Sequence, residues 1–400
     1  LFDRSKKDHD LSRQHDDHFF RRWTFTPDNH VNGPLVGNKQ SAYVWYSVFN
    51  HSRSHVFRTL AADASARHFL AGLSQLGVIP PSVINCDNIT VMKPFKKIVL
   101  AGGSGQMGTA IKNYFKDKTD DIVILSRSAK KADGNVRTVY WDGKTAGEWY
   151  KELENADLLV NLAGKNVNCR YNVKNKKEIF DSRTNSILAL SAAIKKCDRA
   201  PGLWIQCASA TIYRHAEDRP MTEFNGEIGE GFSVEVCKLW EKTFLDATIP
   251  FTSTRKVILR TSLVLGKTEG VFPRLKNLVK FGLGGQQGNG QQWVSWVHEF
   301  DVAAMVEWIS VHPEAEGIIN CTSPFPLKNK AFMKTIRKIY GFPFGLPAPT
   351  WLLKIGAWMI GTETELILKS RWVLPEKISD LGYDFKYPTL EKAVSEILAE

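Results

Sequence analysis

The chain has 400 residues, 43% of them hydrophobic, and carries a formal net charge of +11. This size and composition suit a globular protein of one large or two ordinary domains, and no apolar run reaches the roughly 18 to 20 residues that a membrane span needs. The Lys and Arg residues are dispersed rather than gathered in a basic arm, and the six cysteines have the spacing of neither a disulfide frame nor a zinc site. We therefore expect no nucleic acid, no membrane and no metal among its partners.

Residues 1–91 differ in composition from everything that follows. They contain no Glu, no Met and seven of the ten histidines. We interpret them as a disordered or non-native extension, with Met92 as the native start. An organellar presequence is the alternative, although the many aspartates count against it. The expected location is the cytoplasm, or an organelle matrix if the segment is a native presequence.

From the segment KKIVLAGG onward, strands alternate with helices. KKIVLAGG has the pattern of a strand, QMGTAIKNYFKDK that of a helix and DIVILSR that of the next strand. The turn and the start of the helix carry Gly102, Gly105 and Gly108. Gln106 and Met107 stand between the last two of these glycines. Such glycines permit a tight bend, a close approach of backbone to a pyrophosphate, and helix–strand packing, while the first helix amides face the phosphates. The turn therefore predicts a dinucleotide site.

The end of the second strand indicates which dinucleotide is bound. An NAD site usually places an acidic residue there, whereas this chain has Ser126 and Arg127. A hydroxyl and a guanidinium suit the 2′-phosphate of NADP(H), and solvated surface charges are the plain alternative. NADP(H) is the predicted cofactor.

The next two strands add positions to the same crevice. VRTVYWDG carries Asp142 where an adenine contact is expected, and ADLLVNLAG ends with Leu162, Ala163 and Gly164. The carboxyl ends of parallel strands meet in the crevice where open sheets bind ligands. Small residues there let a cofactor lie against backbone.

Seven ordered motifs give the chain a family resemblance: GGSGQMG, ILSR, NLAG, DSRTNS, LRTSLVLG, GLGGQQGNGQQWVSWVHEFDVA and RWVLPEKISDLGYDF. In these motifs it resembles the extended short-chain dehydrogenases/reductases, and more narrowly an epimerase-like subfamily of largely unknown function. The resemblance implies an α/β fold with a Rossmann-type, doubly wound parallel sheet that binds NADP(H), placed here in residues 92–320. It implies a small, mostly helical C-terminal substrate region, placed in residues 321–400. It further implies cofactor contacts at Glu178, Arg183 and Val264.

The stretch SVEVCKLWE lies where the catalytic helix of this superfamily is expected. Most members use a Tyr as proton donor and a Lys four residues later on the same helix face. Counting back from Glu241 puts Cys237 at the Lys position and Ser233 at the Tyr position. Both groups are absent, so we interpret the stretch as the old catalytic helix with its packing kept and Cys237 as a buried helix residue.

Other residues then have to move the proton and hold the substrate. Ser209 follows a strand where the superfamily keeps a catalytic serine, and Tyr213 stands four residues on. These two are the predicted catalytic residues, with turn capping and packing as their respective alternatives. The glycine- and amide-rich loop is predicted to close over a substrate, or else to be a structural hairpin. Its predicted substrate contacts are Gln292, Trp293, Trp296 and His298.

Two functions fit these residues. The first is an NADP(H)-dependent oxidoreductase or epimerase that acts on a small carbonyl or sugar-like substrate. The second is a catalytically inactive NADP(H)-binding regulatory or interaction protein. The intact nucleotide loop supports both, the missing Tyr and Lys favour the second, and the amide- and Trp-rich loop favours the first. A homodimer is compatible with either.

Overall fold

The computed structural model describes residues 93–128, 131–359, 363 and 365–399. The predicted extension, residues 1–91, lies outside the described residues. Seven parallel strands form the main sheet in the order β10-β6-β5-β4-β1-β2-β3. They are β1 (Phe95–Ala101), β2 (Thr119–Ser126), β3 (Val136–Tyr140), β4 (Leu158–Asn161), β5 (Leu203–Ser209), β6 (Arg255–Thr261) and β10 (Gly317–Cys321).

This strand order confirms the predicted fold class. The chain begins at β1 inside the sheet, adds β2 and β3 toward one edge, and then adds β4, β5, β6 and β10 toward the other. The order reverses between β1 and β4, and open sheets of this doubly wound type bind ligands at that reversal, beyond the carboxyl ends of the strands. The fold therefore sets its crevice where Ala101 and Asn161, the last residues of β1 and β4, are paired.

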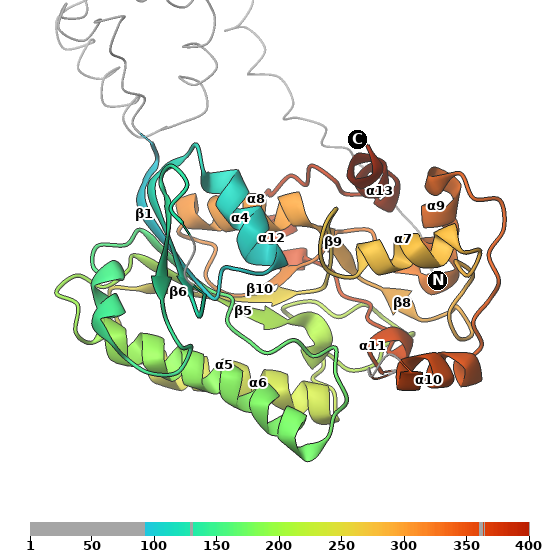
Figure 1. Ribbon diagram of the computed structural model, residues 1–400, viewed down its shortest axis with the longest axis horizontal. Coiled ribbons are helices and arrows are strands. Elements are labelled where there is room, and N and C mark those ends of the chain that lie inside the picture. Colours follow the sequence, from blue (N-terminus) through green and yellow to red (C-terminus); the bar gives the residue numbers. More distant parts are fainter. Residues whose placement is uncertain (1–92, 129–130, 360–362, 364, 400) are drawn as a thin grey trace, which may run out of the picture. The chain divides into compact units, whose positions relative to one another are not determined.

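Helices cover both faces of the sheet (Figure 1). One face carries α4 (Gln106–Phe115) and α8 (Glu299–Val311), and the other carries α5 (Val173–Ile194) and α6 (Phe232–Thr248). The strands are nearly continuous apolar runs because each face is covered. Two hydrophobic clusters result, one on each side of the sheet, with Leu100 in the first and Val99 in the second.

Most of the remaining elements form a smaller, mostly helical region beside the sheet. Its helices are α7 (Phe272–Lys280), α9 (Asn329–Tyr340), α10 (Thr350–Met359), α11 (Glu365–Leu368) and α13 (Leu390–Leu398), and its short strands are β7 (Leu263–Leu265), β8 (Trp293–Val294), β9 (Trp296–His298) and β11 (Leu327–Lys328). Helix α12 (Glu376–Asp380) instead packs beside β10, with Ile378 in the cluster on the α4 side of the sheet. Two 3₁₀ turns, η2 (Glu148–Glu152) and η3 (Ala210–Ile212), lie in the sheet half. Trp296 and Phe332 belong to a third apolar cluster that joins α7, α9 and α13.

A C-terminal segment returns to the sheet half and helps to build the site. Met221 and Trp372 are joined by a backbone hydrogen bond (2.7 Å), and Ser370 Oγ donates to the carbonyl of Ala216 (2.6 Å). On its other side the segment pairs with β8 and β9, since the amide of Ser295 donates to the carbonyl of Arg371. The segment after α11 thus runs between the β5–α6 loop and the smaller region.

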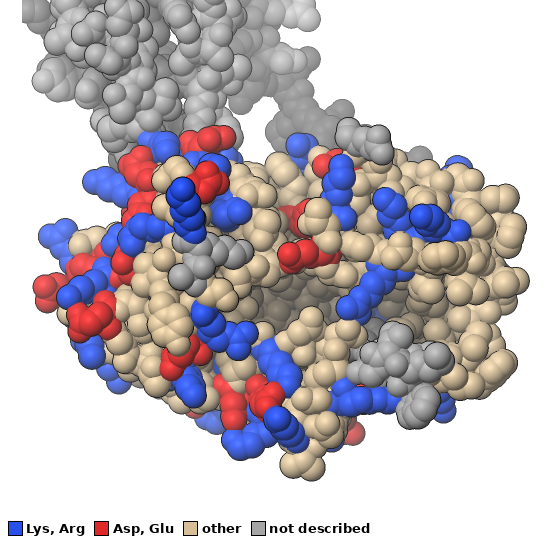
Figure 2. All heavy atoms as spheres, viewed as in Figure 1, with Lys and Arg blue, Asp and Glu red and all other residues tan. Residues whose placement is uncertain are grey.

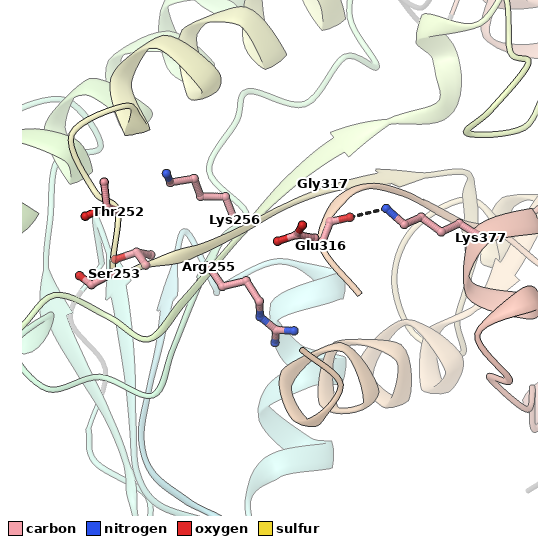
Figure 3. A pocket seen from close by; sticks show the side chains of 8 residues that line it. Thr252, Ser253, Arg255, Lys256, Glu316, Gly317 and Lys377 are labelled. Atoms are coloured by element: carbon pink, nitrogen blue, oxygen red, sulfur yellow. Dashed lines mark hydrogen bonds between the residues drawn. The ribbon is translucent and has the colours of Figure 1, made fainter. Parts of the chain in front are cut away.

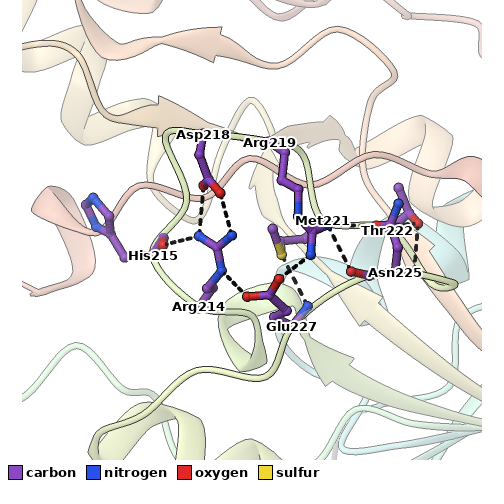
Figure 4. Close-up of polar contacts among 8 residues, drawn as sticks. All are labelled: Arg214, His215, Asp218, Arg219, Met221, Thr222, Asn225 and Glu227. Atoms are coloured by element: carbon purple, nitrogen blue, oxygen red, sulfur yellow. Dashed lines mark hydrogen bonds and ion pairs between the residues drawn. The ribbon is translucent and has the colours of Figure 1, made fainter.

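Charged side chains fasten the β5–α6 loop from within (Figure 4). Arg214 donates to both carboxylate oxygens of Asp218 and to Glu227 (2.5 Å), and Arg219 reaches the second oxygen of Glu227. These pairs are largely solvent-exposed, so their role is to hold the loop in one geometry rather than to add much stability.

Among the described residues, none of the helices has the length and hydrophobicity that a membrane span requires.

Candidate cofactor and catalytic site

The glycine loop between β1 and α4 is shaped by contacts that exclude larger residues. Gly102 adopts a positive φ of 74°, and a Cβ there would lie 2.7 Å from the Cα of Ala163. A Cβ at Gly108 would lie 2.3 Å from the carbonyl oxygen of Gly103. The first contact seats the loop against the end of β4, and the second packs the start of α4 onto the loop.

Gly105 differs from these two because a Cβ there would meet nothing within 4 Å. It is the N-cap of α4, has no side-chain cap, and is followed by a first turn without acidic residues. Helix amides without a capping side chain attract anions, and this opening leaves room for one. The chain therefore offers a cradle that a phosphate fits and that a side chain at position 105 would fill.

The two residues after Gly105 turn away from this opening. Gln106 Nε2 donates to Glu299 Oε2 (3.4 Å), and a Cβ on Gly270 would lie 2.1 Å from Gln106 Oε1. Met107 packs against the hydrophobic cluster on the α4 side of the sheet. The side chain of Gln106 thus ties the loop to the region after β7.

Ser126 and Arg127 stand at the carboxyl end of β2, next to the glycine loop. Ser126 is 8% exposed, and its Oγ accepts a hydrogen bond from the amide of Ser128 (3.2 Å). Arg127 is exposed, and its guanidinium has no hydrogen-bond partner among the described residues. A guanidinium without a protein partner beside a phosphate cradle is suited to a second phosphate.

Asp142 serves a local turn. Its Oδ1 accepts from the amides of Lys144 and Thr145 (both 2.9 Å), and its Oδ2 accepts from Thr145 Oγ1 (2.7 Å). Burial acts to raise its pKa, but these hydrogen bonds outweigh it and lower the pKa. The carboxylate is thus already engaged, and an adenine contact from Asp142 stays a prediction.

The end of β4 and the start of α5 close the other side of the crevice. The amide of Leu162 donates to the carbonyl of Ala101 (2.8 Å), and a Cβ on Gly164 would lie 3.3 Å from the guanidinium carbon of Arg183. Glu178 pairs with Lys165 at the surface. Arg183 is 9% exposed, donates to two backbone carbonyls, and keeps its Nε buried without a partner among the described residues.

Arg183 also lines a partly open cavity of about 100 Å³. Its walls come from the β4–α5 loop, α5, η3, the end of β5 and α6. The polar groups that line it are Tyr171, Arg183, Ser209, Thr211, Ser233 and Cys237. Figure 2 shows the face of the molecule hollowed between the region of α4 and that of α10 and α11, with acidic and basic side chains at the rim.

The two predicted catalytic residues have different surroundings. Ser209 lines the cavity, and its Oγ accepts from the amide of Thr211 (3.2 Å), which caps η3. Tyr213 is 2% exposed and does not line the cavity. Its hydroxyl donates to Asn320 Oδ1 (3.0 Å) and accepts from Arg260 (2.9 Å). The phenol of Tyr213 thus belongs to a buried hydrogen-bond network, which fits the packing alternative, and a catalytic role for Tyr213 stays a prediction.

Ser233 and Cys237, which stand where the superfamily has its Tyr and Lys, both lie on α6, as their spacing predicts. Ser233 and Cys237 both line the cavity, and burial raises the pKa of Cys237 to about 12. Cys237 is buried on α6, which agrees with its interpretation as a buried helix residue, and a raised pKa favours the protonated thiol. Glu241 is buried and forms a two-point ion pair with Arg260 (2.8 and 2.7 Å).

Three residues beside the cavity were missed because no sequence motif marks them. Tyr171 lies in the β4–α5 loop and hydrogen-bonds to Ser233, whose Oγ donates to Glu365 Oε2 (3.3 Å). Lys369 and Arg371 come from the C-terminal segment. Their spatial neighbours are far away in sequence, so neither periodicity nor local spacing could have found them.

The amide- and Trp-rich loop is used mainly for packing. Trp296 is fully buried and donates from Nε1 to the carbonyl of Phe325 (3.3 Å), which fits the structural alternative, and a substrate contact stays a prediction. His298 has a similar structural role: its Nδ1 accepts from the amide of Phe300 and caps α8, and its Nε2 lies 2.9 Å from Glu396 Oε2. Gln292 is buried beside Gln287.

Trp293 is the member of this set that keeps a partly exposed ring. It stacks on Trp372 with ring centres 4.2 Å apart and an angle of 17° between the planes. Trp372 follows Arg371 directly in the chain, so the stacked pair lies next to the C-terminal segment that borders the cavity. A substrate contact by Trp293 stays a prediction.

A second hollow lies at the opposite edge of the sheet, where β6 and β10 begin (Figure 3). Lys377 Nζ donates there to the carbonyl of Glu316 (2.5 Å), and Arg255 donates to carbonyls at the end of α8. Its lining shares no residue with the cavity. Because doubly wound sheets bind at the carboxyl edge, this hollow is not part of the cofactor site.

Comparison with known proteins agrees with the fold. Residues 98–321 match the model of the NAD dependent epimerase/dehydratase family, and residues 348–397 match a domain of unknown function, DUF1731. The epimerase family protein YfhF of Bacillus subtilis is 32% identical over 76% of this chain and 98% of its own.

Solved structures show the same architecture. The human epimerase family protein SDR39U1, isoform 2, crystallised with NADPH, has a TM-score of 0.66 and 26% identity, covering 75% of this chain and 98% of its own. A nucleoside-diphosphate sugar epimerase from Corynebacterium glutamicum has a TM-score of 0.60 and 24% identity, covering 76% of this chain and 59% of its own. The second likeness bears on the fold alone.

Proposed function

The chain belongs to the NAD dependent epimerase/dehydratase family, and from this premise we propose that it is an NADP(H)-dependent oxidoreductase or epimerase for a small carbonyl or sugar-like substrate. The observation that carries the proposal is the junction of two features. The crevice with its phosphate cradle at Gly105 and the hydroxyl-lined cavity share one wall, the guanidinium of Arg183.

The residues of the crevice fit NADP(H). Gly105 leaves space for a phosphate at the start of α4, and Arg127 offers a guanidinium without a protein partner among the described residues. The human relative at 26% identity was crystallised with NADPH, which supports the same assignment. When bound, NADPH would supply the hydride for reduction of a carbonyl carbon.

Tyr171 provides the phenol that the helix position Ser233 lacks. Burial raises the pKa of Tyr171, while its hydrogen bond to Ser233 acts in the opposite direction. The phenol is therefore protonated at neutral pH and able to give its proton to a carbonyl oxygen as the hydride arrives. Arg183 and Arg371 interact with Tyr171 through charge, whereas Glu365 and Glu363 act on the same phenol and raise its pKa. Ser209 supplies a second hydroxyl in the cavity to orient that oxygen.

The second candidate function is cofactor binding without turnover. It is favoured by Cys237, whose buried thiol stands where the superfamily places a charged lysine. In that case the crevice would bind NADP(H), and the cavity would serve recognition only.

A carbonyl screen distinguishes the two functions. We would incubate the full chain with NADPH and small aldehydes, ketones and nucleotide sugars, and follow NADPH absorbance. Turnover with at least one carbonyl is expected, and Tyr171→Phe should reduce it by about 100-fold or more, the range for loss of a general acid. The matched control Tyr213→Phe removes a buried phenol outside the cavity and should keep turnover while the protein is folded.

Each outcome has a defined meaning. Full turnover in Tyr171→Phe would remove Tyr171 from the mechanism. Saturable NADPH binding without oxidation by any carbonyl would favour the non-catalytic candidate.

A further inference from the structure

The outer side of the smaller region exposes several large apolar side chains. Figure 1 shows the chain leaving α9 and running along this side to α10. Two of the exposed residues belong to α10, two to the segment before it and two to the loop after α7. They are Trp351, Ile355, Phe344, Leu346, Phe281 and Leu283, with exposed fractions between 46% and 73%. We call these six side chains the apolar face.

The members of the apolar face are gathered on one part of the surface. The amide of Leu346 donates to the carbonyl of Gly282 (2.8 Å), and a Cβ on Gly282 would lie 3.3 Å from the ring of Phe344. The segment before α10 therefore lies beside the loop after α7. Trp351 follows Leu346 closely in the chain, and Ile355 is four positions further along α10, on the same side of that helix.

The same stretches of the chain carry only positive charge. Residues 270–298 and 317–362 include the apolar face and the helices α7, α9 and α10, and they hold nine Lys or Arg residues but no Asp or Glu. Figure 2 shows basic and no acidic side chains over α7. Lys280 and Lys354 are exposed, and each directly precedes a member of the apolar face. The face is thus accompanied by cations alone in its own stretches of sequence.

A surface of this kind fits the interface of an anionic membrane. Contiguous exposed apolar side chains mark interaction sites. Trp, Phe and Leu enter the boundary between headgroups and acyl chains, while Lys and Arg beside them keep their charges at anionic headgroups. Nucleic acid would use the cations but leave the Leu and Ile side chains without a role. A second copy of this chain is disfavoured, because pairing two such faces would bring their positive charges together.

The expectation of no membrane partner does not cover this case. It was based on the lack of an apolar run of roughly 18 to 20 residues, which a spanning segment needs. A helix that lies in the plane of the interface needs one apolar face only. Helix α10 has such a face in Trp351 and Ile355, with Lys354 beside it.

We propose that the apolar face, together with Lys280 and Lys354, docks this protein on the surface of a membrane that contains anionic lipids. Helix α10 belongs to the stretch that matches the domain of unknown function, so part of that domain gains a role as a docking element. The inference goes beyond the proposed function and does not depend on it, because docking needs neither cofactor nor turnover.

The test is a vesicle sedimentation experiment with the full chain. Vesicles of pure phosphatidylcholine are compared with vesicles made of equal parts of phosphatidylcholine and phosphatidylserine. Binding to the mixed vesicles is expected, and binding to pure phosphatidylcholine should be at least about tenfold weaker. Added salt should weaken binding to the mixed vesicles, since it screens the charges.

Two variants test the apolar part of the surface. Trp351→Ser and Phe344→Ser should each weaken binding to the mixed vesicles by about tenfold, because each removes a ring that the membrane would bury. The matched control is Phe224→Ser, which removes a 67% exposed ring from the β5–α6 loop and should leave binding unchanged.

Two further variants test the charged part. Lys280→Gln and Lys354→Gln should each weaken binding to the mixed vesicles by about fivefold, the effect of one basic residue near an anionic surface. The matched control Lys195→Gln removes the same charge from an exposed position at the end of α5 and should leave binding unchanged.

Three results would overturn the inference. One is equal binding to both kinds of vesicle, and another is binding that is unchanged in both Trp351→Ser and Lys354→Gln. The third is a lack of binding to either vesicle; capture of polyglutamate or of duplex DNA would then assign the surface to an acidic protein or to nucleic acid. A dimer of the full chain that dissociates in Trp351→Ser would assign it to a second copy instead.

Discussion

The crevice and the cavity both lie at the carboxyl edge of one sheet, but the first is lined mainly by backbone and the second by side chains. The crevice consists of backbone, drawn close by Gly102 and Gly108 and left open at Gly105. The cavity is lined by side chains from separate helices and loops, among them the phenol of Tyr171, three hydroxyls and the guanidinium of Arg183. Binding a constant cofactor needs shape, whereas choosing a substrate and moving a proton needs placed functional groups. Substitutions should therefore act on the two parts in different ways.

The largest effect, on the free energy of unfolding, is expected at the buried ion pair of Glu241 and Arg260. The pair Glu241 and Arg260 is buried, with side chains 9% and 7% exposed. Glu241→Gln leaves the guanidinium without its counter-charge and should lower the free energy of unfolding by about 3–5 kcal/mol. Chemical denaturation measures this. The control Lys242→Gln breaks a neighbouring exposed pair with Asp246 and should have little effect. Equal losses in both variants would refute the account of the buried pair.

A smaller and more selective effect is expected at the glycine loop. Gly105→Ala adds a methyl group that meets no protein atom, so stability should be kept while NADPH affinity falls by about 10- to 100-fold because the cradle is filled. Gly108→Ala adds a methyl group 2.3 Å from a carbonyl oxygen and should lower stability and affinity together. Thermal unfolding and fluorescence titration separate the two. Unchanged affinity in Gly105→Ala would remove the phosphate cradle from the account.

Arg127 should affect one form of the cofactor only. Arg127→Ala removes the exposed guanidinium at the end of β2 and should weaken NADPH about tenfold, or about 1.4 kcal/mol, while NADH affinity stays the same. Paired titrations with both cofactors measure it. A parallel loss of NADPH and NADH affinity would show that Arg127 contacts something other than the 2′-phosphate.

The smallest effect concerns pH and lies outside both regions. Burial lowers the pKa of His298 below 6.5, although Glu396 acts to raise it. The unfolded chain therefore binds more protons below pH 6.5 than the folded chain, so this residue's stabilising contribution is present above about pH 6.5 and is lost as the pH falls. His298→Asn keeps an acceptor at the cap of α8 and should flatten the drop in melting temperature between pH 7 and 5. An identical drop in the variant would place the titration elsewhere.

The sequence predicted what depends on neighbours along the chain. Strand and helix periodicity, the glycine spacing and the position of Ser233 on α6 are local patterns, and the fold and the protonated thiol of Cys237 agree with them. For Tyr213 and His298 the residue type suggested chemistry, whereas their burial could not be predicted from local sequence. Tyr171 acquires its place only when α5 and α6 pack together, and no spacing encodes that contact.

Lys369 illustrates the same limit at longer range. Its partner Thr211 stands 158 residues earlier in the chain, and the contact forms because the segment after α11 runs back along the β5–α6 loop. In the sequence, Lys369 is one of 53 basic residues with nothing to distinguish it. The topology of the chain sets this contact, and composition does not report it.

The most direct test of the central claim is a titration of the full chain with NADPH and with NADH, followed by energy transfer from tryptophan to the reduced nicotinamide. We predict saturation by NADPH at micromolar concentration and binding of NADH that is about tenfold weaker or more, because the crevice pairs an open phosphate cradle with Arg127. Saturation by neither cofactor, or by both with equal affinity, would contradict the account.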